Sequence, residues 1–299
     1  MPRSAHLHGP AHHVFHALLA VGLGGLLLAA VLGLHVGWIH PITLGVGGIV
    51  LAHVVLFGAV AVAVRHLSHR HQGGGHEAGG EIIFHHSHRY DRLVRLLTLG
   101  REGRLRGWML DLAEVHGGDA ALDVGCGTGT LLLAAAARVG PEGLLRGVEP
   151  APAMRARAIE KTAAAGVDVK VVDGSAGALP FEPASFDAVF CTLVLHHLPD
   201  AMRPEAVREI ARVLRPGGRA LIVDWQHPGS LTAALTDPMA LAFLLHGVGG
   251  RASPLDDMGI VPLMEELGFV GVERRTWGGG SLTAVLGRMR AAEPEKERP

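Results

Sequence analysis

The sequence predicts a doubly wound α/β domain with a mostly parallel sheet, preceded by two transmembrane helices. Strand-like and helix-like segments alternate from about residue 89 onward, and this alternation favours right-handed crossovers between parallel strands. The first strand of the series runs directly into a turn that contains three glycines. At the N-terminus, no Asp, Glu, Lys or Arg occurs between Arg3 and Arg65. The chain therefore divides into an uncharged segment and an α/β domain.

The expected strands are short apolar runs bounded by glycine, proline or helix-forming segments. They are Ala120–Val124, Leu144–Val148, Val167–Val172, Phe186–Leu193, Arg219–Val223, Val270–Trp277 and Ser281–Arg288. Amphipathic or alanine-rich patterns predict one or two helices within Tyr90–Val115, and further helices over Thr130–Val139, Pro152–Ala165, Pro204–Leu214 and Asp256–Gly268. The Arg-Pro-Gly-Gly sequence at 215–218 is expected to break the chain before the fifth strand.

The glycine turn has the sequence Leu-Asp-Val-Gly-Cys-Gly-Thr-Gly over residues 122–129. Gly125, Gly127 and Gly129 allow positive φ angles and a close approach of backbone to a ligand. Glu149 ends the next strand, where an acidic side chain can accept hydrogen bonds from ribose hydroxyls. The spacing is G-x-G-x-G and not the G-x-G-x-x-G of pyrophosphate sites. It therefore indicates a nucleoside-type cofactor without phosphates.

Two apolar runs, Ala17–Leu34 and Pro41–Val64, are each near the ~20 residues that cross a bilayer. A buried helical hairpin in a soluble domain is the alternative, but its core would have to cover both helices on all sides. Arginines follow the second run, whereas the loop His35–His40 carries no formal charge, so the positive-inside rule places the large domain in the cytoplasm, anchored to the cell membrane. The expected parts are a His-rich tail (1–16), a transmembrane hairpin (17–65), a His/Gly-rich linker (66–88), the α/β domain (89–290) and a charged tail (291–299).

Composition excludes several classes of protein. The net charge of −1 argues against a nucleic-acid binder held by bulk electrostatics. Two cysteines, Cys126 and Cys191, argue against a disulfide scaffold and fit a reducing compartment. Histidines cluster on both sides of the hairpin, either as solvated groups near lipid headgroups or as ligands of a transition metal. Since no structural-zinc spacing is present, we expect no metal site.

Five segments together resemble the class I S-adenosylmethionine-dependent methyltransferases over roughly Tyr90–Met289. In chain order they are LDVGCGTG, GVEPAPAM, GSAGALPF, SFDAVFCTLVLHHL and REIARVLRPGG. Their order and spacing are specific, and they are most similar to the group with quinone-ring C-methyltransferases and bacterial phospholipid N-methyltransferases. The resemblance implies a seven-stranded, Rossmann-like sheet with S-adenosylmethionine as the cofactor.

The resemblance also implies which residues contact the cofactor. They are Asp123, Gly125, Cys126, Gly127, Gly129, Glu149, Pro150, Met154, Ser175, Ala176, Cys191 and Thr192. In this mapping Asp123 and the glycine turn face the methionine part, Glu149 holds the ribose diol, and Pro150 and Met154 pack on adenine. Ser175 stands where many relatives have Asp, but its hydroxyl can still accept a hydrogen bond from the adenine amine. The two cysteines have a simpler alternative role as small buried apolar residues.

The catalytic residues are unknown from the sequence, and the candidates are Tyr90, His196 and Asp224. Of His196 and His197, one is expected to pack or cap the following helix and the other to face the cleft. Asp224 either lines the substrate side or merely ends its strand. Methyl transfer depends mainly on alignment of the reactants, and a base is required only where the nucleophile is protonated.

The segment Ser230–Val248 is strongly apolar and is either a core helix or a lid that faces lipid-soluble substrates. With the hairpin, it predicts a membrane-anchored methyltransferase of a lipophilic small molecule, either a quinone precursor or a phospholipid amine. Two alternatives stay open: a methyltransferase of a soluble molecule that the hairpin only localises, and a non-catalytic cofactor-binding sensor. The sequence does not predict the oligomeric state.

Overall fold

The computed structural model describes residues 90–92, 94–95, 98–226, 255–277 and 280–291. All of them belong to one of the two compact units into which the chain divides, the unit formed by residues 73–240 and 251–299. The predicted hairpin, the two histidine clusters and the apolar segment 230–248 lie outside the described residues. Within the described ranges, no helix is long and apolar enough to span a membrane, and no cluster of ligand side chains could hold a metal ion.

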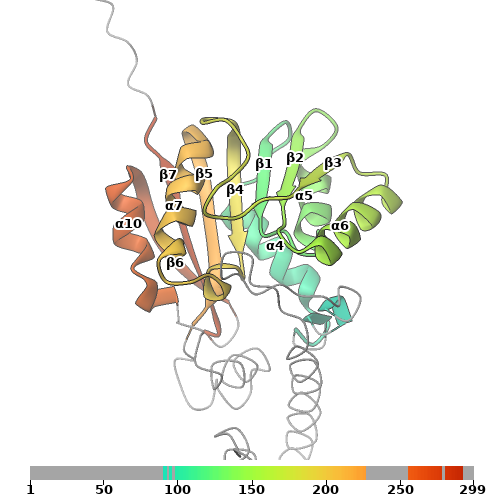
Figure 1. Cartoon of the computed structure of the whole chain (residues 1–299), viewed down its shortest axis with the longest axis horizontal. Coiled ribbons are helices and arrows are strands. Elements are labelled where there is room, and N and C mark those ends of the chain that lie inside the picture. The colour runs from blue at the N-terminus through green and yellow to red at the C-terminus, as the bar shows by residue number, and fades with distance from the viewer. Residues whose placement is uncertain (1–89, 93, 96–97, 227–254, 278–279, 292–299) are drawn as a thin grey trace, which may run out of the picture. The chain divides into compact units, whose positions relative to one another are not determined.

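A seven-stranded sheet forms the centre of the domain, with the strand order β3-β2-β1-β4-β5-β7-β6 (Figure 1). Its strands are β1 (Ala120–Val124), β2 (Leu144–Val148), β3 (Val169–Val172), β4 (Phe186–Thr192), β5 (Leu214–Trp225), β6 (Phe269–Trp277) and β7 (Leu282–Met289). The first five strands pair in parallel, and β7 is antiparallel to both β5 and β6. The prediction of a seven-stranded, mostly parallel sheet is therefore confirmed.

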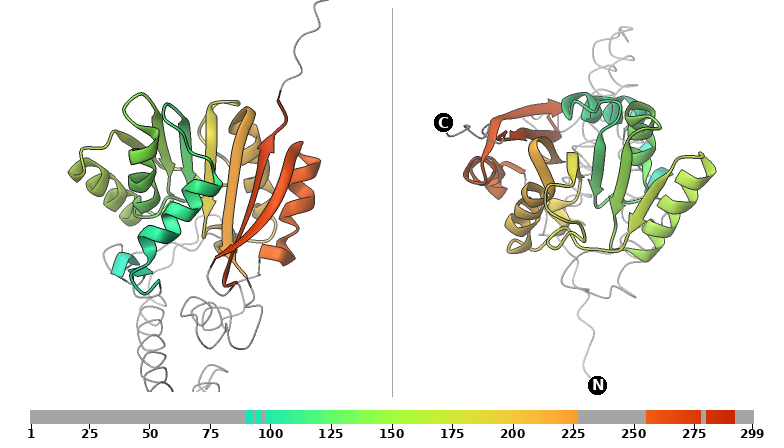
Figure 2. Two further views of the ribbon diagram at one scale, coloured as in Figure 1. Left: turned by 180° about the vertical axis from the view of Figure 1, so that it is seen from behind. Right: turned by 90° about the horizontal axis from the view of Figure 1, so that it is seen from above.

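Helices lie on both sides of this sheet (Figure 2). They are α4 (Glu102–Leu112), α5 (Thr130–Val139), α6 (Pro152–Ala164), α7 (Met202–Val213) and α10 (Ile260–Glu266), with short 3-10 turns η2 (Leu195–His197) and η3 (Leu255–Met258). Helix α5 packs against α4 and α6, whereas α7 packs against α10. Most predicted elements agree with these bounds to within two residues, because the apolar runs in this domain end at a glycine, a proline or a charged residue.

The glycine turn joins a buried strand to a closely packed helix. All five residues of β1 are buried, and Gly125, Gly127 and Gly129 have φ angles of 68°, 55° and 73°. A Cβ atom on Gly129 would lie 3.0 Å from the Cβ of Ala158 in α6. Glycine at 129 therefore serves helix packing as well as the turn, because a side chain there would push α5 away from α6.

Two expected boundaries are wrong. Arg215–Gly218 does not break the chain before the fifth strand, because β5 already begins at Leu214 and includes these residues. Leu214 pairs with Phe186 and Arg219 pairs with Ala188, so the extra residues form a bulge that shifts the register, and the two strands pair on both sides of it. The helix expected over Asp256–Gly268 is interrupted at Gly259, whose φ of 65° separates η3 from α10.

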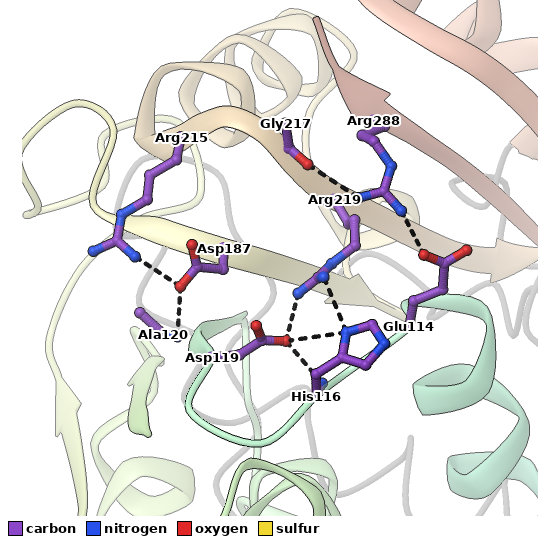
Figure 3. A network of polar contacts seen from close by, with 9 residues as sticks. All are labelled: Glu114, His116, Asp119, Ala120, Asp187, Arg215, Gly217, Arg219 and Arg288. Atoms are coloured by element: carbon purple, nitrogen blue, oxygen red, sulfur yellow. Dashed lines mark hydrogen bonds and ion pairs between the residues drawn. The ribbon is translucent and has the colours of Figure 1, made fainter. Parts of the chain in front are cut away.

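A network of charged side chains lies at the end of the sheet where the parallel strands begin (Figure 3). Arg219 of β5 pairs with Asp119, which precedes β1, and both side chains are 13% exposed. Arg215 binds Asp187 at 2.7 Å, and the same carboxylate oxygen accepts the N–H of Ala120 at 2.9 Å. These contacts connect β1, β4 and β5 at their amino ends. The carboxyl ends of the strands lie at the opposite end of the sheet, which this network does not cover.

Candidate active site

A pocket opens at the carboxyl ends of the parallel strands. It is lined by Tyr90, Gly125, Gly127, Glu149, Pro150, Met154, Gly174, Ala176, Leu193, Val194, His197 and Leu198. Six residues of the predicted cofactor site are among them: Gly125, Gly127, Glu149, Pro150, Met154 and Ala176. The pocket thus lies where ligands bind in doubly wound sheets, beside the turns that follow β1, β2 and β3.

Glu149 joins two of these turns. Its side chain is 8% exposed, and its Oε2 accepts the N–H of Gly127 at 2.9 Å. Its Oε1 accepts the N–H of Ala151 at 2.9 Å, just before α6 begins. Each carboxylate oxygen can accept more than one hydrogen bond, so Glu149 retains acceptor capacity for two neighbouring hydroxyls of a ribose.

Backbone rather than side chain forms two walls of the pocket. A Cβ on Gly125 would lie 2.5 Å from Cγ2 of Val194. A Cβ on Gly174 would lie 3.1 Å from both Pro180 and Val148. Neither position has room for a side chain, and a ligand at these walls meets peptide groups directly.

Asp123 in β1 has a buried carboxyl group with spare acceptor capacity. The residue is 1% exposed, and its Oδ1 has no hydrogen-bond partner within the described part of the chain. Burial first, and then the nearby charge of Glu149, raise the pKa of Asp123 to about 8, although the positive charge of Arg106 opposes both effects. The unpartnered carboxyl oxygen can accept a hydrogen bond from the amino group of a methionine moiety, so the residues present fit S-adenosylmethionine.

Arg106 on α4 is a site residue that the sequence analysis missed. Its positive charge lowers the pKa of both Asp123 and Tyr90, so it lies within electrostatic range of the pocket. Burial lowers the pKa of Arg106 itself. The sequence feature that could have identified Arg106 is its position next to Leu105 and near Met109, at the margin of the apolar face of α4.

Tyr90 is held at the pocket by its neighbour in the chain. Asp91 accepts a hydrogen bond of 2.5 Å from the Thr128 hydroxyl and one of 3.0 Å from Lys161. Lys161 also donates to the Thr130 hydroxyl at 2.7 Å. Burial raises the pKa of Tyr90 to about 12, so near neutral pH this residue is a phenol that can donate a hydrogen bond, not a phenolate base.

His196 and Asp224 satisfy one another and do not line the pocket. Trp225 Nε1 donates to His196 Nε2 at 3.2 Å, which leaves the ring proton on Nδ1 to be donated to Asp224 Oδ1 at 2.6 Å. Asp224 also accepts the backbone N–H groups of His196 and Trp225. This buried pair fixes the loop after β4 in the orientation that brings the next residue, His197, to the pocket.

The pocket lining does not include the other predicted cofactor contacts. They are Asp123, Cys126, Gly129, Ser175, Cys191 and Thr192. Burial raises the pKa of both cysteine thiols well above its ordinary value, so they remain protonated apolar groups. The Ser175 hydroxyl accepts the N–H of Gly177 at 3.3 Å, within the turn that follows β3. The structure adds Gly174, Leu193, Val194, His197 and Leu198 to the predicted set.

Residues 121–218, which include the glycine turn and the LHHL segment with His196 and His197, match the family model of the methyltransferase domain. The matched stretch is less than half of the chain. Over 143 residues the chain is 34% identical to the demethylmenaquinone methyltransferase of Bacillus cytotoxicus, covering 48% of this chain and 60% of that protein. It is 37% identical over 142 residues to the demethylmenaquinone methyltransferase of Staphylococcus aureus, covering 48% of this chain and 58% of that protein. The chain therefore spans about three fifths of the length of these relatives.

Solved structures share the architecture of the methyltransferase domain. A SAM-dependent methyltransferase from Aquifex aeolicus superposes with a TM-score of 0.51 at 20% identity, covering 69% of this chain and 99% of that one. A protein of Pyrococcus horikoshii gives a TM-score of 0.51 at 16% identity, covering 68% and 99%. At these identities the comparison shows the fold, which is that of the S-adenosylmethionine-dependent methyltransferases.

We expect Asp123→Asn to remove a pH dependence of stability. The folded state holds the Asp123 proton up to a pKa of about 8, whereas the unfolded chain releases it near its ordinary value of 3.8. Wild-type stability should therefore fall as pH rises between these values, by up to about 1.4 kcal/mol per pH unit, and level off above pH 8. Denaturant unfolding at several pH values between 5 and 8 measures this slope. Parallel curves for wild type and variant would contradict the assignment.

Proposed function

We propose that this chain is a membrane-anchored, S-adenosylmethionine-dependent methyltransferase that methylates a ring carbon of a lipophilic quinone precursor. The observation that carries the proposal is the pocket itself, where Glu149 and the backbone of the glycine turn meet above the buried carboxyl of Asp123. The relatives named demethylmenaquinone methyltransferase support the choice of a quinone precursor over a phospholipid amine.

The cofactor end of the pocket is built from the first two strand ends. Glu149 would hold the ribose hydroxyls, and the unpartnered Asp123 oxygen would accept a hydrogen bond from the methionine ammonium group. Met154, Pro150 and Ala176 give the apolar surface that an adenine ring requires. When bound, S-adenosylmethionine supplies a methyl group on a positively charged sulfur, which makes that methyl electrophilic.

The acceptor end of the pocket is formed by the loop after β4. Leu193, Val194 and Leu198 provide apolar contacts for a ring, and His197 lies among them. A quinol carbon becomes nucleophilic when its neighbouring hydroxyl loses a proton. His197 is the pocket residue suited to take that proton, because Tyr90 remains protonated and both oxygens of Glu149 already accept backbone hydrogen bonds.

The membrane anchor in this proposal is the uncharged segment 17–65, with the methyltransferase domain on the cytoplasmic side. The apolar runs are long enough to cross the bilayer, and the arginines that follow them match the positive-inside rule. An anchor of this kind would keep the pocket close to the bilayer in which isoprenoid quinone precursors dissolve.

Glu149→Gln should weaken S-adenosylmethionine binding about 10- to 100-fold. The amide places an N–H group against the backbone N–H of Gly127 or Ala151 and removes the charge that strengthens hydrogen bonds to the ribose. Isothermal calorimetry on the detergent-solubilised chain measures the affinity, with Glu160→Gln on the exposed surface of α6 as the control. Absence of binding by wild type, or equal binding by the Glu149 variant, would reject the assignment of S-adenosylmethionine to this pocket.

His197→Ala should lower kcat for a demethylated quinol by about 10²- to 10⁴-fold with little change in the KM for the cofactor, because the variant lacks the proton acceptor. The rate is followed by mass spectrometry of the product, which gains one methylene. His116→Ala, whose side chain is 63% exposed at the far edge of the sheet, serves as the control. Transfer to a phospholipid amine instead would reject the acceptor, and cofactor binding without transfer to any lipid would favour the sensor alternative.

The anchor predicts that the full chain stays in the membrane pellet after alkaline carbonate extraction. A tag at the C-terminus should be cut by protease only in inverted vesicles, since the domain is placed in the cytoplasm. Release of the chain into the carbonate supernatant would show that the segment 17–65 does not span the bilayer.

A further inference from the structure

Four arginines near the start of the described chain have exposed side chains without partners among the described residues. Arg92, Arg95, Arg101 and Arg104 make no hydrogen bond or ion pair to any residue that the structure describes. Most other arginines of the domain are paired with carboxylates: Arg138, Arg155, Arg157, Arg203, Arg208, Arg212, Arg215, Arg219, Arg275 and Arg288. Four arginines without a described carboxylate partner thus lie within one short segment, which also carries the carboxylate of Glu102.

An exposed leucine lies between the two arginine pairs. Leu99 is 49% exposed, and it occupies a left-handed turn with a φ of 51°. The turn is fixed by a hydrogen bond from Gly100 N–H to the Arg95 carbonyl at 2.7 Å, and by one from the Thr98 hydroxyl to the Val94 carbonyl at 2.9 Å. A fixed apolar tip flanked by arginines is the composition of a surface that binds at a lipid–water interface.

This segment is part of the pocket wall. Tyr90 lines the pocket, and Asp91 holds Thr128 and Lys161 next to the glycine turn. In Figure 1 the segment from residue 90 to 100 lies at the edge of the sheet where the parallel strands end. An external surface that binds Arg92, Arg95, Leu99, Arg101 and Arg104 would therefore also orient the pocket relative to that surface.

We propose that these five residues, the arginine face, bind the headgroups of anionic phospholipids, with the Leu99 side chain inserted among the acyl chains. The face complements a negatively charged lipid surface, and each arginine strengthens such binding about fivefold. A nucleic acid is the weaker candidate, because the whole chain carries a net charge of −1 and the face presents an apolar tip. The inference rests on the proposed function, because the role of such lipid binding would be to turn the pocket toward a lipid-soluble acceptor.

Hydrogen–deuterium exchange of residues 90–104 tests the proposal on the full chain in nanodiscs. The nanodiscs contain phosphatidylcholine alone or phosphatidylcholine with phosphatidylglycerol. We expect anionic lipid to slow exchange in this segment by about fivefold or more in wild type. The quadruple variant R92Q/R95Q/R101Q/R104Q should exchange equally in both nanodiscs. The control R208Q/R274Q/R275Q/R290Q removes the same charge from other exposed positions and should behave as wild type.

Leu99→Asn separates docking from folding. Asparagine tolerates the positive φ better than leucine, so the variant should fold at least as well as wild type and yet be protected less by anionic lipid, because it keeps the arginines but has no apolar side chain to insert. Equal exchange of wild type in both nanodiscs would overturn the proposal, as would protection by an oligonucleotide in detergent without protection by lipid. The measurement requires neither cofactor nor turnover, so a failure of S-adenosylmethionine binding by the same samples would reject the proposed function and leave the docking result unchanged.

Discussion

The carboxylate of Glu149 is the interaction on which the pocket depends. It accepts one backbone N–H from the glycine turn and one from the start of α6, so a single side chain sets the spacing of two turns that belong to different strands. Hydrogen bonds to a charged acceptor are stronger than those to a neutral one, and this one is only 8% exposed. The turns are therefore arranged for a ligand before it arrives, and binding does not have to supply that ordering.

Charged groups are distributed differently at the amino ends and at the carboxyl ends of the parallel strands. Where the parallel strands begin, Arg219, Arg215 and Arg288 are neutralised by Asp119, Asp187 and Glu114. Where the strands end, the buried Asp123 has a carboxyl oxygen without a partner among the described residues, and burial favours its protonated form. The amino ends thus carry a stabilising network, whereas the carboxyl ends keep a buried acceptor that a donor group of a ligand could satisfy, in a low-dielectric setting where such hydrogen bonds are stronger.

The fold of the described domain could be predicted closely because its strands are apolar runs with clear ends. The Arg-Pro-Gly-Gly segment was misjudged because local turn propensity does not show that a bulge preserves strand pairing on both sides. The glycine turn and Glu149 were predictable from spacing, but Arg106 was not, since a lone arginine on an amphipathic helix usually faces solvent. The choice between His196 and His197 depended on the hydrogen bonds of Asp224 and Trp225, which are distant in sequence from the LHHL motif.

Asp91 also determines how the domain is joined to the chain that precedes it. Its carboxylate is held by Thr128 and Lys161, so the first described segment is fastened both to the glycine turn and to helix α6. A force on the chain before residue 90 would load these hydrogen bonds, and Thr128 would pass part of it to the backbone between Gly127 and Gly129. A pull from the N-terminal side would therefore act on the same glycine turn that lines the pocket.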